Sequence, residues 1–274
     1  MSDVLIKAYH GGLGDCLQFS TLPEQFSKQQ GRDTYVLDES DFRNKEIYDL
    51  VWGCNPYIKG VKSGHWNAGD IPEIRFTNDN GYHSCIKNWE ELHGLKPTNE
   101  YPKIYYEPKK VEGYEDCILV DLSSISLKHD GNKRSFPPAY DPKEVVAEYE
   151  KIREKYPDKK FIQVFFEQNL GSQSIQIESD DGVLVKSIFH YCDLMRSSFG
   201  IIGLYSGQSA LSAAILEYNP DLLSFCMVSE AVYKKHSLQS GFIFDKLNYV
   251  IIPETEEVSV SYTHLRAHET GRNL

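Results

Sequence analysis

Short apolar runs alternate with segments in which apolar residues recur at helical spacing, beginning with the first residues of the chain. Residues 4–9 (VLIKAY) predict a buried strand, and residues 17–26 predict a helix. Residues 34–37 then predict a second strand, and residues 46–52 a short helix. This order of elements predicts a βαβ opening of the kind found in α/β folds.

A polar excursion, one helix and a proline-flanked strand are predicted next. Residues 65–80 are rich in glycine, asparagine and aspartate, which is typical of an exposed loop. Residues 83–93 (HSCIKNWEELH) have helical spacing, and Gly94 is well placed as the left-handed residue that ends the helix. Residues 102–108 (PKIYYEP) predict a strand, and the charged residues 109–116 predict a connection between domains.

The second half of the chain repeats the alternation. Asp141 and Pro142 predict a helix start, because aspartate is a favoured N-cap and proline suits the first helical position. Five apolar runs predict the strands of a parallel sheet: 117–122, 160–166, 199–205, 222–228 and 249–252. Three further helices are predicted between these strands: 187–195, 210–217 and 230–236.

The predicted elements divide the chain into three parts. Residues 1–114 predict an N-terminal Rossmann-like domain, and residues 115–257 a C-terminal one. Residues 258–274 have no apolar period that would dock on a sheet, and VSYTHLRAHET resembles translated adapter DNA, so we interpret this tail as non-native. His264 and His268 stand four residues apart, as a metal pair on a helix would, but they belong to that tail.

Composition narrows the class of protein. The 274 residues are 41% hydrophobic and carry a net charge of −11, which argues against nucleic acid or an anionic membrane as the main partner. No run is long enough to span a membrane, and the N-terminus lacks signal-peptide flanks, so we expect a cytoplasmic protein with at most peripheral membrane contact. Six cysteines lack CxxC spacing, and Cys16 is interpreted as a packing thiol rather than a nucleophile.

The first candidate site is the glycine-rich turn after the first strand. Gly11, Gly12 and Gly14 permit positive φ and close approach of a ligand, and Asp15 stands at the start of the following helix. That position is the carboxyl end of a strand, where α/β sheets bind ligands. The spacing is not GxGxxG, so three interpretations stay open: a substrate loop, the cofactor loop of a methyltransferase or dehydrogenase, and a turn that only closes the strand onto the helix.

A second candidate site begins at Ser206. The strand ending at Tyr205 leads into Ser206, Gly207, Gln208 and Ser209, which start a helix of small residues. Free N–H groups at a helix start, together with polar side chains, hold a diphosphate in many proteins. The alternative is a helix that Ser206 caps without any ligand.

Together, the two motifs carry a family resemblance. GGLGDCLQFSTLP near the start and DLMRSSFGIIGLYSGQSALSAAI near the end resemble glycosyltransferase family 9, the lipopolysaccharide heptosyltransferases, in order over residues 1–257. The resemblance implies the GT-B architecture, with two Rossmann-like domains facing a central cleft. It also implies that Asp15 is the catalytic base, with Gly12 and Gly14 in the same substrate-binding loop.

The second motif of the family, D-[ST]-G-x-x-H-L-A-A, implies contacts to the donor. Ser206 and Gly207 match it, while Tyr205 stands in place of the aspartate and Ala210 in place of the histidine. The resemblance also implies a donor-phosphate contact from Lys133 or Arg134 and a donor or ribose contact from Glu167, although these side chains are equally compatible with exposed charges.

These observations predict a glycosyltransferase that moves a sugar from a nucleotide-diphosphate sugar to a hydroxyl of a glycan or lipid-linked acceptor in cell-envelope polysaccharide biosynthesis. No metal is expected, because the Asp-x-Asp pair of metal-dependent transferases is not found in the sequence. The nucleotide-diphosphate sugar is expected as a substrate, and no cofactor besides it. A catalytically silent sugar-nucleotide or glycan-binding relative is the alternative that the Tyr205 and Ala210 departures permit.

Overall fold

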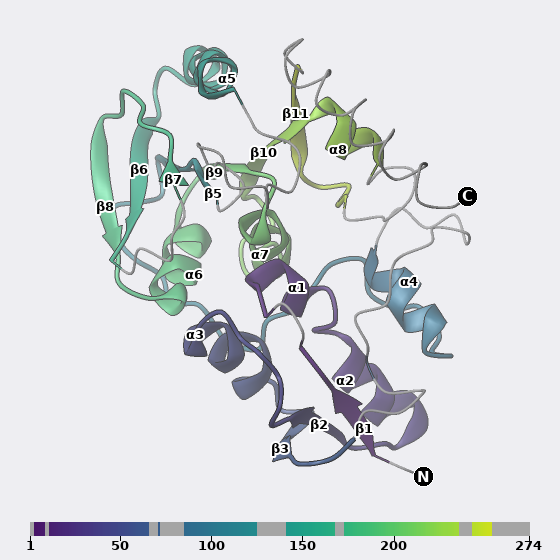
Figure 1. Ribbon diagram of the computed structural model, residues 1–274. Helices are drawn as coiled ribbons and strands as arrows, with labels where there is room; N and C mark the ends of the chain where they lie inside the picture. Colours follow the sequence, from purple (N-terminus) through teal and green to yellow (C-terminus); the bar gives the residue numbers. More distant parts are fainter. Residues whose placement is uncertain are drawn as a thin grey trace, which may run out of the picture.

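The computed structural model describes residues 3–8, 11–65, 71, 85–124, 141–167, 173–235 and 243–253, with only the backbone at four of them (124, 173, 231 and 235). Within these ranges the chain forms two α/β units, each built on a parallel sheet, and the units follow one another along the sequence (Figure 1). The predicted α/β class is therefore confirmed. Lys133, Arg134 and the tail from residue 258 lie outside the described residues.

A small parallel sheet forms the centre of the first unit. Strands β1 (Val4–Ile6), β2 (Thr34–Leu37) and β3 (Ile58–Lys62) lie in that order, and Ile71 adds a parallel bridge beside β1. The two predicted strands are confirmed. The third strand was not predicted as one, because most of its side chains are exposed and Gly60 interrupts it with a φ of 134°, so it has no apolar run.

Short helices surround this sheet. Four α-helices are described in the first unit: α1 (Leu13–Leu17), α2 (Leu22–Gln25), α3 (Lys45–Tyr48) and α4 (Cys85–Leu92). Two π-helical turns continue α2 and α3: η1 (Phe26–Gln30) and η2 (Asp49–Gly53). The single helix predicted over residues 17–26 is divided by a turn before α2, where Pro23 lacks the N–H that an uninterrupted helix would use. Gly94 follows α4 with a φ of 68°, as predicted.

The second unit is built on a six-stranded parallel sheet. Its strand order is β11-β10-β9-β4-β6-β8. The strands are β4 (Cys117–Asp121), β6 (Lys160–Phe166), β8 (Asp181–Val185), β9 (Gly200–Leu204), β10 (Leu223–Ser229) and β11 (Asn248–Ile252). All five predicted strands are confirmed. The edge strand β8 was missed because only its last residue is buried, which leaves no apolar run to recognise.

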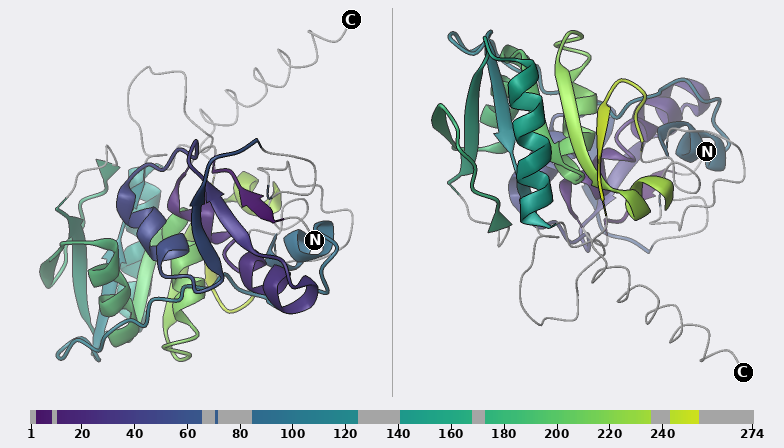
Figure 2. Two further views of the ribbon diagram at one scale, coloured as in Figure 1. Left: turned by 90° about the horizontal axis from the view of Figure 1, so that it is seen from below. Right: turned by 90° about the horizontal axis from the view of Figure 1, so that it is seen from above.

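Helices cover both faces of this sheet. α5 (Pro142–Lys155) covers one face of the sheet (Figure 2). It packs there against Ile118 and Val120, and Asp141 is its N-cap, as predicted. α6 (Ile188–Ser197) and α7 (Gly207–Ile215) pack on the opposite face. α8 (Glu230–Lys235) lies beside β10 and β11. A two-stranded ladder, β5 (Ser123–Ser124) with β7 (Gln173–Ser174), completes the described elements.

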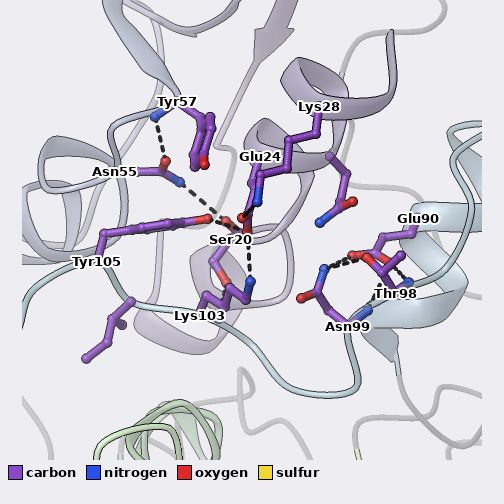
Figure 3. Close-up of polar contacts among 12 residues, drawn as sticks. Ser20, Glu24, Lys28, Asn55, Tyr57, Glu90, Thr98, Asn99, Lys103 and Tyr105 are labelled. Atoms are coloured by element: carbon purple, nitrogen blue, oxygen red, sulfur yellow. Dashed lines mark hydrogen bonds and ion pairs between the residues drawn. The ribbon is translucent and has the colours of Figure 1, made fainter. Parts of the chain in front are cut away.

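Residues 95–114, here called the strap, connect the two units without forming the strand predicted at 102–108. On the first unit, Glu24 accepts hydrogen bonds from Lys103 Nζ (2.8 Å) and the Tyr105 hydroxyl (3.0 Å), and Glu90 accepts one from Thr98 N (Figure 3). On the second unit, Asp193 of α6 accepts from the Tyr106 hydroxyl at 2.9 Å. The strap is therefore held by these side-chain contacts and not by the backbone hydrogen bonds of a sheet.

The two units also pack directly on one another. α1 lies against α7 (Figure 1). One continuous apolar cluster runs from β1 and α1 of the first unit into α6, α7 and the six-stranded sheet. At a second contact, Glu46 of α3 accepts a hydrogen bond from Ile188 N at the start of α6 at 2.9 Å. The carboxyl ends of β1 and β9 therefore meet where α1 and α7 begin.

Candidate active site

The glycine-rich turn connects β1 to α1 and is held in place by the loop that follows β2. Gly11 has a φ of 43°, and a Cβ atom there would stand 1.9 Å from the carbonyl oxygen of Asp41, so only glycine fits. Gly12 is the N-cap of α1 with a φ of −73°, and Gly14 lies within α1. Positive φ is therefore needed at one of the three glycines, whereas the sequence suggested it for all three.

Asp15 lies in the first turn of α1 with its side chain 47% exposed. Its carboxylate lies beside Gly12, where a Cβ atom would stand 2.5 Å from Asp15 Oδ2. Among the described residues, none donates a hydrogen bond to this carboxylate. Glycine at position 12 thus provides the space for a carboxylate that is open to solvent.

Arg43 is a neighbour of Asp15 that the sequence analysis missed. Its backbone N–H donates to the Gly11 carbonyl at 3.2 Å, and its guanidinium Nη2 lies 4.0 Å from Asp15 Oδ2. The available signal was its place after the second parallel strand, since the carboxyl ends of neighbouring parallel strands share one edge of the sheet. A basic residue following β2 could therefore have been expected near the turn that follows β1.

Gly14 and Gly207 lie against one another where α1 packs on α7. A Cβ atom on Gly207 would stand 2.8 Å from Gly14 N and 2.9 Å from the Leu13 Cβ. The sequence assigned the missing side chain of Gly207 to the approach of a phosphate. In the structure, the missing side chain also lets the starts of α1 and α7 pack closely.

The sequence predicted that three polar side chains surround one point at the start of α7. The structure shows a different arrangement. Ser206 Oγ accepts from Gln208 N at 3.3 Å and so caps the helix. Ser209 is buried, and its hydroxyl donates to the Ser206 carbonyl at 2.7 Å. Gln208 is 6% exposed and folds over the bare backbone of Gly203. Two of the three side chains therefore face the interior of the second unit.

The Gln208 side-chain amide is buried without a hydrogen-bond partner among the described residues. It lies over Gly203 in β9, the strand residue that pairs with Asp121 of β4. The Asp121 carboxylate accepts hydrogen bonds from Ser123 N at 3.1 Å and from the Tyr191 hydroxyl at 2.7 Å. Burial raises the pKa of Asp121, and these hydrogen bonds act against that rise. The Gln208 amide and the Asp121 carboxylate are therefore both buried near Gly203, close to the start of α7. The sequence analysis did not predict these buried polar groups.

The other predicted donor contacts lie further from α7 or outside the described residues. Glu167 is exposed just beyond β6, with its backbone N–H donating to the Val185 carbonyl at 3.0 Å. β6 is two strands from β9, or about 10 Å at the usual strand spacing. Tyr205 is half-buried and Ala210 is buried. No described geometry bears on Lys133 and Arg134.

Nucleophilic thiol chemistry is disfavoured at this site. Cys16 is buried beside Asp15, and burial raises the pKa of its thiol to about 12, in agreement with the packing role expected from the sequence. Within the described ranges, no three His, Cys, Asp or Glu residues are grouped as a metal site would require. The helices described there are too short or too polar to cross a membrane.

No protein-family model and no curated protein sequence matches the chain. Solved structures do resemble it. E. coli heptosyltransferase WaaC with ADP has a TM-score of 0.56 at 7% identity, over 98% of this chain and 99% of that one. The glycosyl transferase family 9 structure from Veillonella parvula has a TM-score of 0.55 at 9% identity, over 96% and 88%.

A third match, the dodecameric iron-containing glycosyltransferase TibC from enterotoxigenic E. coli, has a TM-score of 0.51 at 14% identity, over 83% of this chain and 60% of TibC. The chain thus spans less than two thirds of the length of TibC. The chain has the two-unit, GT-B type of fold seen in heptosyltransferases of glycosyltransferase family 9, as the two sequence motifs predicted.

Proposed function

We propose that the protein is a glycosyltransferase that moves a sugar from a nucleotide-diphosphate donor to a hydroxyl of a glycan or lipid-linked acceptor, without a metal and with inversion. Besides the fold, the main support for this proposal is the position of Asp15 relative to the start of α7. Asp15 has an open carboxylate and directly follows Gly14, which touches the first residue of α7. The proposed base therefore lies next in sequence to the residue that contacts the start of α7, and a helix start is suited to bind an anion.

Asp15 is the proposed general base. Its carboxylate takes the proton of the acceptor hydroxyl while the hydroxyl oxygen forms a bond to the anomeric carbon of the donor. The bond from that carbon to the diphosphate oxygen breaks, and its electron pair leaves with the nucleotide diphosphate. Attack from the face opposite the leaving group inverts the anomeric carbon.

The start of α7 is the proposed site for the charge of the leaving diphosphate. Ser206 and Gly207 lie half-buried at the positive end of α7, where backbone N–H groups stabilise anions. Lys133 or Arg134 is proposed to add a positive charge, and Glu167 a contact to the ribose or sugar. The buried Ser209 contributes by fixing the helix start through its hydrogen bond to the Ser206 carbonyl, and no direct donor contact is proposed for the buried Gln208 side chain.

The donor sugar is proposed to differ in its contacts from those of the family motif. Tyr205 and Ala210 replace an aspartate and a histidine of that motif, and Ala210 is buried. Among the similar structures, one is described as a heptosyltransferase in complex with ADP-D-beta-D-heptose and another holds ADP. ADP-linked sugars are therefore the first donors to test, in a protein that we place in the cytoplasm and in cell-envelope polysaccharide synthesis.

Thermal shift with a panel of nucleotide sugars and free nucleotides tests this proposal first. Stabilisation by one nucleotide-sugar class, followed by detection of transfer to glycan acceptors or slow donor hydrolysis, is the expected result. Stabilisation by S-adenosylmethionine or NAD alone would contradict it and favour the cofactor-loop alternative.

A catalytically silent binding protein is the second candidate. The replaced aspartate and histidine, together with the inward Gln208 and Ser209, favour it specifically. Tight nucleotide binding with neither transfer nor hydrolysis across the donor panel would select this function over catalysis.

A further inference from the structure

The backbone of Arg43 is held in place beside the open carboxylate of Asp15. Its own N–H donates to the Gly11 carbonyl, and Asp41 N donates to the Ala8 carbonyl at 2.9 Å, so the loop is attached to the glycine-rich turn twice. On its other side, Asn44 caps α3 by accepting a hydrogen bond from Ile47 N at 2.9 Å. The backbone that carries Arg43 is therefore fixed before and after it.

The guanidinium of Arg43 occupies the space above Gly12. A Cβ atom on Gly12 would stand 3.1 Å from Arg43 Cζ, so position 12 leaves room for this group as well as for Asp15. The side chain is 50% exposed. Among the described residues, no atom accepts a hydrogen bond from its guanidinium, and its only ion pair there is the 4.0 Å contact with Asp15.

This pair contributes little to stability. Exposed ion pairs of this length have a small effect on folding, since water screens them. An arginine has five N–H donors in a planar fork that matches carboxylate and phosphate oxygens. A fixed loop that presents such donors, without an acceptor among the described residues, is suited to bind an anion from outside the chain.

We infer that Arg43 binds a substrate oxyanion, phosphate or carboxylate, directly beside the hydroxyl that Asp15 deprotonates. The inference rests on the proposed function and adds a specificity-determining residue to it. The 4.0 Å separation from Asp15 places the anion next to the reacting hydroxyl. Two sources have this chemistry: a phosphate of the donor, and an acidic group on the acceptor.

Binding measurements on Arg43→Gln and Arg43→Lys test the inference and separate the two sources. Lys45→Gln is the matched control, because it removes a nearby positive charge whose partner is Asp49, the first residue of η2. ADP binding is measured by calorimetry. Binding of glucuronate and glucose 6-phosphate, with glucose as the neutral comparison, is measured by saturation-transfer NMR on the protein with ADP present.

If the anion is a phosphate of the donor, ADP should bind at least about tenfold more weakly to Arg43→Gln, which is the scale of a charge-assisted hydrogen bond. Arg43→Lys should then recover part of the lost affinity. If the anion is an acidic group of the acceptor, Arg43→Gln should bind ADP as wild type does. It should lose the saturation-transfer signals of glucuronate and glucose 6-phosphate. Lys45→Gln should behave as wild type in both measurements. If Arg43→Gln binds ADP and both acidic sugars as wild type does, or if wild type binds none of them, the inference is wrong.

The proposed function fails differently. Wild-type protein that binds acidic sugars through Arg43 but is stabilised by no nucleotide or nucleotide sugar would contradict the glycosyltransferase proposal and retain the anion site. Nucleotide-sugar transfer that is equal in wild type and Arg43→Gln, with equal anion binding, would retain the glycosyltransferase and remove Arg43 from its substrate contacts.

Discussion

Gly14 and Gly207 touch through their backbones, and a side chain on Gly207 would stand 2.8 Å from Gly14 N. This contact joins the turn that carries Asp15 to the helix proposed to hold the donor diphosphate. The distance between the proposed base and the proposed diphosphate site is thereby set by helix packing rather than by a flexible loop. Variants at these two glycines consequently change the spacing of the two proposed groups.

Gly207→Ala should destabilise the protein by about 1–3 kcal/mol, because the new methyl group meets backbone and Cβ atoms that cannot rotate away. Thermal or urea unfolding measures the change. Gly64→Ala is the control, since a Cβ atom there would meet only the ends of two leucine side chains, at 3.6 and 3.8 Å. Equal melting temperatures for Gly207→Ala and wild type would show that α1 and α7 are not packed as described.

Asp15→Asn should retain folding and nucleotide affinity while lowering transfer by about 10²-fold or more, the contribution of a positioned base. Initial rates with the donor found in the panel provide the measurement. Asp41→Asn removes an exposed carboxylate from the adjacent loop and should keep full activity. Unchanged turnover in Asp15→Asn would remove Asp15 from the mechanism.

Gln208→Met should stabilise the protein or leave it unchanged, because it replaces a buried amide that has no partner among the described residues with an apolar chain of similar shape. A gain of up to about 1–3 kcal/mol corresponds to the cost of an unsatisfied buried group. Gln163→Met is the contrasting control, because Gln163 Nε2 donates to the Ile175 carbonyl at 3.1 Å, and its loss should destabilise. A clear loss of stability in Gln208→Met, measured by urea unfolding, would indicate that the amide has a partner.

Tyr191→Phe should lower stability at neutral pH, and the difference from wild type should shrink as the pH falls. Burial raises the pKa of Asp121 in the folded protein, and the Tyr191 hydrogen bond opposes the rise, so its removal raises that pKa further. A carboxyl group whose folded pKa is raised binds protons more readily in the folded state, so stability increases as pH falls toward the ordinary aspartate value. Urea unfolding at pH 5 and pH 7.5 measures this.

Tyr218→Phe is the control for that pH dependence. Its hydroxyl donates to the Ile104 carbonyl at 2.8 Å, which does not titrate, so the stability lost should be similar at both pH values. A difference between wild type and Tyr191→Phe that stays constant or grows at pH 5 would contradict the assignment to Asp121.

The sequence predicted those parts of the fold that depend on local signals. Asp141 before Pro142 marked the start of α5, and Gly94 marked the end of α4, because capping geometry depends on a few neighbouring residues. Buried parallel strands such as β4 were equally clear, since both of their faces are apolar. The strap was predicted as a strand because its tyrosines and Ile104 resemble one, whereas side-chain contacts with Glu24 and Asp193 hold it in place.

The candidate site was predicted only in part. Asp15 and the two glycine-containing turns are visible as motifs, but the direction of a side chain at a helix start depends on what lies beneath it. Gln208 faces inward because Gly203 leaves space for its amide, and those two residues belong to different elements. Arg43 approaches Asp15 only because the β2 loop folds back onto the glycine-rich turn. Such long-range contacts have no signature in a single sequence.

The continuous apolar cluster that passes between the two units has a consequence for chimeras. A crossover placed in the strap would join the first unit of one parent to the second unit of another. Such a hybrid would separate the α1 surface from the α7 surface with which it packs. Exchange of the second unit between proteins of this fold should therefore work only when α1 and the turn before it are transplanted with that unit.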